Sequence, residues 1–157
     1  MTGAGTRTGD RAVSTTVTYV LTVAITTVLM SGLIMAAGGV LDDRTESATR
    51  NELAVVGERV ANELVTADRL VAAGTEPTVR LRTTHPTRVV GSSYTVRIRT
   101  GSDSPCDGPQ CLVLSAGDVT VTVPFTTDTP VTRSSATGGA ILVRYDRSAE
   151  ALEVTDP

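Results

Sequence analysis

The chain has 157 residues and a formal net charge of −3, and all 14 of its basic residues are arginine. This acidic balance argues against nucleic acid as a partner, because binding to phosphates needs a net cationic face. Outside one long apolar stretch near the amino end, the remaining length is that of a single small globular domain.

The apolar stretch covers residues 12–41, and it contains no charged side chain: AVSTTVTYVLTVAITTVLMSGLIMAAGGVL. A helix of this length reaches roughly 45 Å, more than the roughly 30 Å of a hydrocarbon core. Buried helices of soluble domains seldom exceed about 20 residues and carry a charged stripe. The sequence therefore predicts a membrane-spanning helix over residues 13–41.

The flanks of this stretch predict its direction. Arg7 and Arg11 precede it, whereas Asp42 and Asp43 follow it. Basic flanks stay in the cytoplasm, so we expect a cytoplasmic amino end and an extracellular carboxyl part. A secretory signal has an apolar run of about 7 to 15 residues closed by an Ala-x-Ala pattern, and this stretch is too long and lacks the pattern.

The four residues where the stretch begins, Arg11-Ala12-Val13-Ser14, resemble the cleavage site of archaeal type IV pilin-like proteins. The same four-residue motif is similar to the start of many pilins from halophilic archaea. The resemblance implies that a prepilin peptidase removes residues 1–12 by cutting between Ala12 and Val13. Thr15 stands where a proline commonly follows the serine, and Val17 stands where bacterial pilins carry an acid. Arginine without lysine and a surplus of acids also resemble proteins of high-salt environments.

Small and hydroxylated side chains recur on the predicted span. Threonines at spacings of three and four share one helical face, and a small-xxx-small pair follows, the spacing that lets helices approach closely in lipid. One interpretation is a packing face for other copies or a partner helix. The other, which we favour, is that the hydroxyls bond to carbonyls of their own helix. The residues are Thr15, Thr18, Thr22, Thr26, Gly32 and Ala36.

A second, amphipathic helical pattern covers residues 42–74. Its apolar positions fall within a narrow arc at 3.6 residues per turn, opposite a charged and polar face, so one face is predicted to be buried. Gly74 and Pro77 predict its end. Because nothing but the pair Gly38-Gly39 interrupts the two patterns, we expect one helix of about 60 residues, with any kink at that pair. The apolar positions are Leu53, Val56, Val60, Leu64, Ala67 and Val71.

Residues 75–157 change to a period of two, which predicts antiparallel strands. Hairpins are expected around Gly117 and through residues 146–148, and residues 124–139 are expected to form a long polar loop. The sheet needs the amphipathic helix as a cover, because this part holds few large apolar side chains. The predicted fold class is α+β: a long amino-terminal helix packed on a small antiparallel β-sheet head, as in pilins.

Two cysteines, Cys106 and Cys111, flank a turn in GSDSPCDGPQC. Outside the cell we expect them to form a disulfide, worth about 2 kcal/mol for so short a loop. The competing interpretation is half of a metal site, but structural zinc needs four ligands and the chain has one histidine. Asp103 and Asp107 are expected to lie in a solvated loop.

No constellation of catalytic residues, phosphate loop or dinucleotide-binding pattern is recognisable. His85, which precedes Pro86, is expected to be an exposed turn residue. We therefore expect neither an enzyme nor a cofactor, and no metal.

The predicted function is that of a type IV pilin-like cell-surface protein, a subunit or minor component of an extracellular filament. Its expected partners are membrane lipid, prepilin peptidase and copies of itself or related pilins. The alternative is an uncleaved single-span envelope protein whose extracellular β-rich domain binds a partner. Cleavage of the first 12 residues separates the two.

Overall fold

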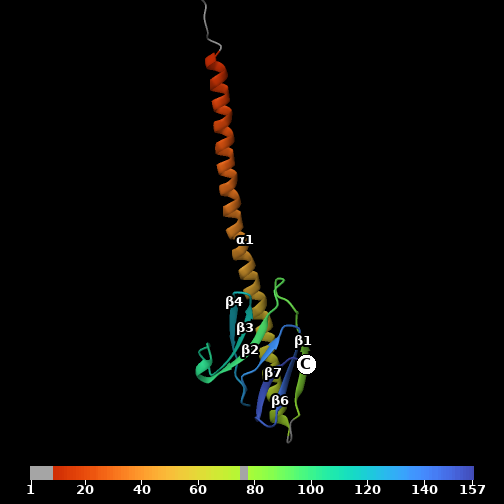
Figure 1. Cartoon of the computed structure of the whole chain (residues 1–157). Helices are drawn as coiled ribbons and strands as arrows, with labels where there is room; N and C mark the ends of the chain where they lie inside the picture. The colour runs from red at the N-terminus through yellow and green to blue at the C-terminus, as the bar shows by residue number, and fades with distance from the viewer. Residues whose placement is uncertain (1–8, 75–77) are drawn as a thin grey trace, which may run out of the picture. The chain divides into compact units, whose positions relative to one another are not determined.

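The computed structural model describes the backbone of residues 9–74 and 78–157, and it describes side chains from residue 16 onward except at 37, 39–41 and 75–77 (Figure 1). The chain divides into two compact units. We call residues 1–44 the anchor unit and residues 45–157 the head unit. Each is described by itself.

One helix, α1, runs from Gly9 to Ala73 and contributes to both units. It continues through Gly38 and Gly39 and ends one residue before Gly74. The prediction of a single long helix is confirmed. Within the head unit, the polar face predicted from the pattern is exposed, as Arg59 and Asn62 illustrate. The opposite face is buried, through Leu53, Val56, Val60, Leu64 and Ala67, with Val71 partly buried.

Seven strands form two antiparallel sheets beside the head part of α1 (Figure 1). The three-stranded sheet has the order β1-β6-β7, and the four-stranded sheet has the order β4-β3-β2-β5. A short 3-10 helix, Gly101–Asp103, follows β2. The strands are β1 Arg80–Thr84, β2 Thr95–Thr100, β3 Gln110–Ala116, β4 Val119–Pro124, β5 Ser135–Thr137, β6 Ala140–Asp146 and β7 Ala151–Thr155.

Both predicted hairpins are confirmed. Strands β3 and β4 pair from Ala116↔Val119 outward, around Gly117, whose φ of 56° is a conformation that glycine adopts without strain. Strands β6 and β7 pair from Asp146↔Ala151, and the Asp146 carboxylate accepts hydrogen bonds from the backbone and hydroxyl of Ser148 in the turn. The fold is α+β, as expected, with two sheets where one was predicted.

The prediction of one long loop over residues 124–139 is wrong. Residues 135–137 form β5, which pairs with β2, and residues 130–132 bond to β7 through Leu152. The sequence hides these pairings because Ala136 is the one buried side chain of β5, which is too short for an alternating pattern. The segment is ordered by backbone hydrogen bonds, and through it the two sheets meet.

The helix α1 lies close against the four-stranded sheet at Gly57. A Cβ placed on this residue would lie 2.7 Å from Val123 Cγ2 and 2.8 Å from Leu114 Cδ1, closer than carbon atoms can pack. Glycine therefore lets the helix lie directly on β3 and β4. Glycine destabilises the helix by about 1 kcal/mol relative to alanine, and the contact between α1 and the sheet offsets this cost.

We predict that Gly57→Leu destabilises the head unit. The added side chain has no space between helix and sheet, and overpacking of this kind costs typically 1–3 kcal/mol and occasionally more. Thermal unfolding of the full chain in detergent, followed by near-ultraviolet circular dichroism, should show a lower Tm. Gly108→Ala is the control, because no atom lies within 4 Å of a Cβ at Gly108. An unchanged Tm for Gly57→Leu would contradict the close contact.

Candidate functional site

The predicted cleavage motif, Arg11 to Ser14, lies within the first turns of α1, which begins at Gly9. The side chains of these four residues, and that of Thr15, lie outside the described part of the structure. What the structure adds is that the backbone is helical across the expected scissile bond between Ala12 and Val13.

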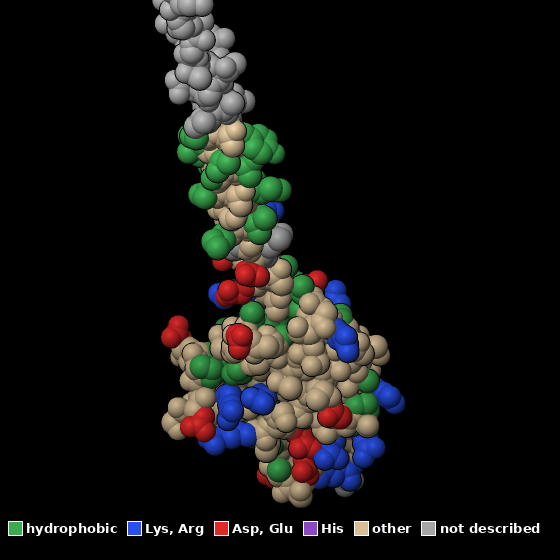
Figure 2. All heavy atoms as spheres, turned by 45° about the horizontal axis from the view of Figure 1, so that its top comes forward, with side chains coloured by type: hydrophobic (Ala, Val, Ile, Leu, Met, Phe, Trp, Pro, Cys, Tyr) green, Lys and Arg blue, Asp and Glu red, His purple; other side chains and the backbone are tan. Residues whose placement is uncertain are grey.

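The anchor unit holds one segment, Thr16–Ala36, that is long and apolar enough to cross a membrane. All of its described side chains are exposed in the chain taken alone, and hydrophobic side chains cover the described anchor segment in Figure 2. A helix that is apolar all round and lacks a protein partner is stable when lipid surrounds it. This amino-terminal helix indicates a membrane anchor or a signal sequence.

The hydroxyl groups of the anchor bond to their own helix. The side chains of Thr22 and Thr26 each donate to the carbonyl four residues earlier, at 2.8 Å, and Thr27 and Ser31 do the same at 2.8 and 2.9 Å. Each hydroxyl hydrogen is thereby satisfied without water, which makes these residues compatible with hydrocarbon. This is the interpretation that we favour from the sequence.

Within the part of the chain that the structure describes, no other segment packs on the small residues Gly32 and Ala36 of the anchor. No atom comes within 4 Å of a Cβ placed on Gly32, and Ala36 is exposed. A close approach by a helix of another molecule is therefore sterically open at this pair, while nothing in the described chain occupies it. The packing of the predicted face against another copy stays a prediction for all six of its residues, Thr15, Thr18, Thr22, Thr26, Gly32 and Ala36.

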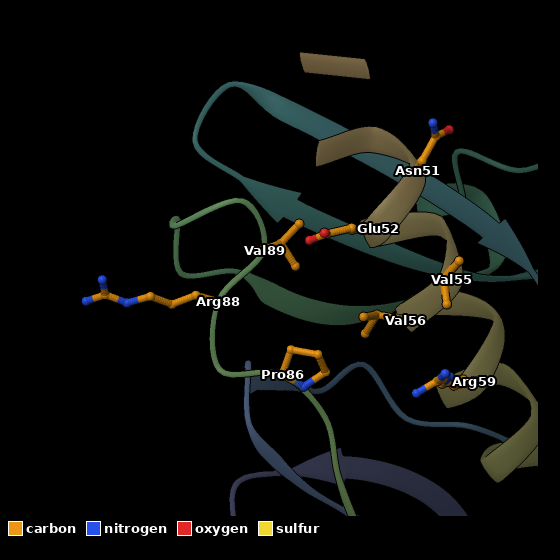
Figure 3. Close-up of a pocket in the computed structure, with 8 residues that line it drawn as sticks. All are labelled: Asn51, Glu52, Val55, Val56, Arg59, Pro86, Arg88 and Val89. Carbon is orange, nitrogen blue, oxygen red and sulfur yellow. The ribbon is translucent and has the colours of Figure 1, made fainter. Parts of the chain in front are cut away.

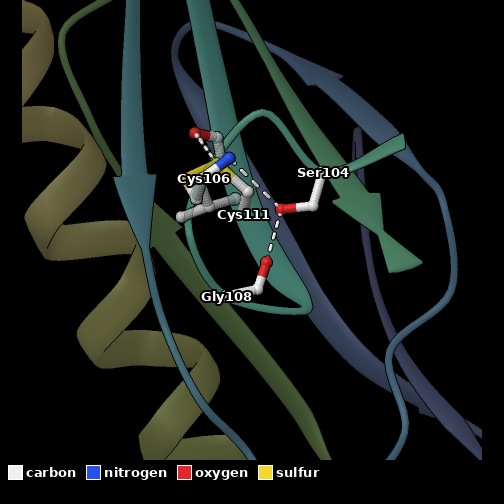
Figure 4. Close-up of a disulfide and its surroundings, with 5 residues drawn as sticks. Ser104, Cys106, Gly108 and Cys111 are labelled. Atoms are coloured by element: carbon white, nitrogen blue, oxygen red, sulfur yellow. Dashed lines mark hydrogen bonds between the residues drawn. A yellow bond between two sulfur atoms is a disulfide. The ribbon is translucent and has the colours of Figure 1, made fainter. Parts of the chain in front are cut away.

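Cys106 and Cys111 are joined by a disulfide, and Cys111 is fully buried at the start of β3 (Figure 4). Ser104 organises the loop between them: its hydroxyl donates to the carbonyl of Gly108 at 2.7 Å and accepts the N–H of Cys106 at 3.3 Å. Asp103 and Asp107 are exposed, and Asp103 pairs with Arg133 at 2.7 Å. A disulfide is typical of oxidising, extracellular surroundings.

His85 is not the exposed turn residue that its position before Pro86 predicts. It is only 5% exposed, and its backbone N–H donates to the carbonyl of Gly139 at 2.8 Å. Its Nε2 lies 3.0 Å from the hydroxyl of Thr83 and 3.3 Å from the carboxylate of Glu63. The sequence could not reveal this partner, because Glu63 lies on α1, 22 residues upstream.

The three groups resemble a nucleophile–histidine–acid set, but their geometry differs from one. The Thr83 hydroxyl donates to Glu63 at 2.8 Å, and both oxygens lie near the same ring nitrogen, Nε2. In a catalytic triad the acid contacts the other ring nitrogen, opposite the one that faces the hydroxyl. The arrangement links α1 to the end of β1.

A groove of about 470 Å³ lies between α1 and the loop after β1 (Figure 3). Its floor is apolar and its rim carries charged groups. Within it, the Glu52 carboxylate accepts the backbone N–H of Val90 at 3.2 Å and so holds the loop to the helix. The lining residues are Asn51, Glu52, Val55, Val56, Arg59, Pro86, Arg88 and Val89.

The sequence analysis missed this groove, although one signal was present. Val55 is an apolar residue on the polar face of the amphipathic helix, beside Glu58 and Arg59, and it is 53% exposed. The other wall comes from a tight turn, in which Val89 pairs with Ser92 across Val90 and Gly91. Only the fold brings the two together.

Asp68 on α1 is hydrogen-bonded to the segment after β4. Its carboxylate accepts the backbone N–H groups of Asp128 at 3.1 Å and Thr129 at 2.8 Å. Burial by itself would raise the pKa of this carboxyl, but hydrogen bonds from the side chain and backbone of Thr129 and the backbone of Asp128 lower it below its ordinary value. The ionised form is therefore the one that the fold stabilises.

We predict that Asp68→Asn lowers the free energy of unfolding by about 1–3 kcal/mol at neutral pH, because the amide presents N–H groups to backbone donors. Since the pKa is lowered in the folded chain, the contribution of Asp68 is full above the ordinary carboxyl pKa of about 3.9 and is lost as the pH falls through the folded value. Denaturant unfolding at several pH values should show the free energies of unfolding of the wild type and Asp68→Asn converging in acid.

The matched control is Asp118→Asn, an exposed residue in the turn between β3 and β4. It should leave the unfolding free energy unchanged at every pH. A difference between wild type and Asp68→Asn that is the same at pH 7 and in acid would contradict the role of the ionised carboxylate.

Among the residues that the structure describes, no group of three or more histidine, cysteine, aspartate or glutamate side chains could hold a metal ion. Cys106 and Cys111, the two cysteines that a metal half-site would use, are joined in a disulfide. The candidate functional features of the described chain are therefore its apolar anchor, its disulfide-closed loop and the groove.

The model of one protein family, a family of unknown function designated DUF7266, matches residues 8–155. The match spans the motif at Arg11–Ser14, the whole of the apolar helix and both sheets. No curated protein matches the chain significantly, and no solved structure does. Since the match covers nearly the whole sequence, the chain belongs to the DUF7266 family.

Proposed function

We propose that the chain is a type IV pilin-like surface protein, a membrane-anchored subunit or minor component of an extracellular filament. One observation carries the proposal: the processing motif Arg11-Ala12-Val13-Ser14 directly precedes an uncharged helix that continues into the cover of a small β head. Each part alone is common, whereas their order in one helix is what the resemblance to archaeal pilins implies.

The anchor supports this function because it suits both lipid and a helical bundle. The hydroxyls of Thr22, Thr26, Thr27 and Ser31 bond to carbonyls of their own helix, so they do not oppose either environment. Release from lipid into a bundle of like helices trades lipid contacts for helix packing, which small residues such as Gly32 and Ala36 favour. Other copies of the chain and prepilin peptidase are the partners that this function requires.

The head supports an extracellular location. Its disulfide suits an oxidising environment, and the acids Asp42 and Asp43 lie just beyond the apolar segment while Arg7 and Arg11 precede it. We infer a cytoplasmic amino end, a single span and a head outside the cell. The high-salt habitat implied by the arginine-rich, lysine-free composition belongs to the same proposal.

The proposal predicts that the mature chain begins at Val13. Amino-terminal sequencing of protein extracted from membranes should find Val13 first, and Arg11→Glu or Ala12→Asp should leave the leader in place, because the peptidase reads the residues beside the scissile bond. Thr8→Ala, outside the motif, is the control and should be processed normally.

A mature chain that starts at Met1 or Thr2 would overturn the proposal. It would leave an uncleaved, single-span envelope protein whose head binds a partner. A start within or after residues 36–41 would instead identify the apolar helix as a cleaved signal sequence.

A further inference from the structure

We propose that the groove between α1 and the turn at Val89–Ser92 receives the acidic segment Asp42–Asp43 of a second copy of this chain. The contact rests on the proposed assembly of copies, and it adds to that function the surface through which a head holds its neighbour. Three properties of the groove carry the inference: its apolar floor, its charged rim and the conformation of its turn.

The floor of the groove is apolar and open to water. Val55 is 53% exposed and Pro86 is exposed, whereas Val56 and Val89 lie beneath them, 4% and 1% exposed (Figure 3). Apolar side chains that line a concave surface gain free energy when another chain covers them. Val55 also breaks the polar face of α1, where a charged residue would keep the pattern.

The rim is net positive. Arg59 and Arg88 come from opposite walls, and Arg88 extends its guanidinium outward from the loop (Figure 3); among the described side chains neither has an ion-pair partner. Glu52 is the acid of the groove, and it is already engaged by the N–H of Val90. The two guanidinium groups are therefore available to carboxylates from outside, which they can bind through charge-assisted hydrogen bonds.

Asp42 and Asp43 supply the complementary charge. In the sequence, two acidic residues are adjacent only at Asp42-Asp43. Both side chains are exposed, and neither has an ion-pair partner among the described side chains. Among the described acids, Glu46 pairs with Arg50, Asp103 with Arg133 and Glu153 with Arg144, whereas isolated exposed acids such as Glu58 and Asp118 have no ion pair and lack the doubled charge of Asp42–Asp43.

The turn beside the groove is held in a conformation that its sequence disfavours. Val90 has φ 45°, a left-handed conformation that β-branched residues rarely adopt, and it is 42% exposed. Backbone strain of this kind concentrates at binding surfaces. Here the hydrogen bond from the Val90 N–H to Glu52 keeps the turn against α1.

Cross-linking between two differently tagged copies of the full chain tests the contact. One copy carries Val55→Cys and the other carries Glu46→Cys, one helical turn after the acids. Oxidation of the assembled protein should give a mixed dimer on a non-reducing gel. Leu70→Cys replaces Val55→Cys as the matched control, because Leu70 is 50% exposed on the same helix but lies outside the groove.

Charge reversal tests the specificity. Arg59→Glu with Arg88→Glu in the Val55→Cys copy should reduce the mixed dimer at least tenfold. Asp42→Arg with Asp43→Arg in the other copy should restore it. Arg97→Glu, an exposed arginine of β2, should have no effect.

The proposal would be overturned if Leu70→Cys gave as much mixed dimer as Val55→Cys. It would also be overturned if the amount of mixed dimer were unchanged by Arg59→Glu with Arg88→Glu. An adduct of Val55→Cys with a different protein would overturn it as well. Filaments that form from Val13-initiated chains without the mixed dimer would overturn the groove contact alone. Chains that keep their leader and form neither filaments nor dimers would overturn the assembly function as well.

Discussion

The head depends on the burial of one face of α1 against two small sheets. Neither sheet could form a core alone, because the chain has a single phenylalanine, no tryptophan and few large apolar residues beyond its anchor. The helix supplies what is missing through Leu53, Val60 and Leu64, all with no exposed surface. Gly57 brings it into direct contact with β3 and β4, and Asp68 and Glu63 tie its polar edges to loops and to β1.

The same helix carries two different patterns of apolar residues. In the head its apolar residues form a stripe, since protein covers one side and water the other. In the anchor they surround the helix, and Thr22 and Thr26 turn their hydroxyls onto the backbone. The change occurs at Asp42, where charge first appears after the apolar run. A membrane-anchored head requires this division, and so does a subunit whose helix later packs among others.

Local patterns explain what the sequence predicts and what it misses. The helix, its buried face and both hairpins follow from periodicities and turns within a few residues, and all were predictable. Strand β5, the burial of His85 and the groove depend on partners far along the chain: β2 for Ser135–Thr137, Glu63 for His85, and Val89 for Val55. The cleavage motif is readable only by resemblance, since its four residues have no physical signature of their own.

The central claim is that residues 16–36 lie in lipid and hold the head outside the cell. Thr122→Cys places a thiol on the exposed face of β4, where a membrane-impermeant maleimide can report its location in intact cells. The account predicts labelling before lysis, on protein that remains with the membrane or with filaments after alkaline extraction. Labelling only after lysis, or release of the full-length chain into the soluble fraction, would contradict it.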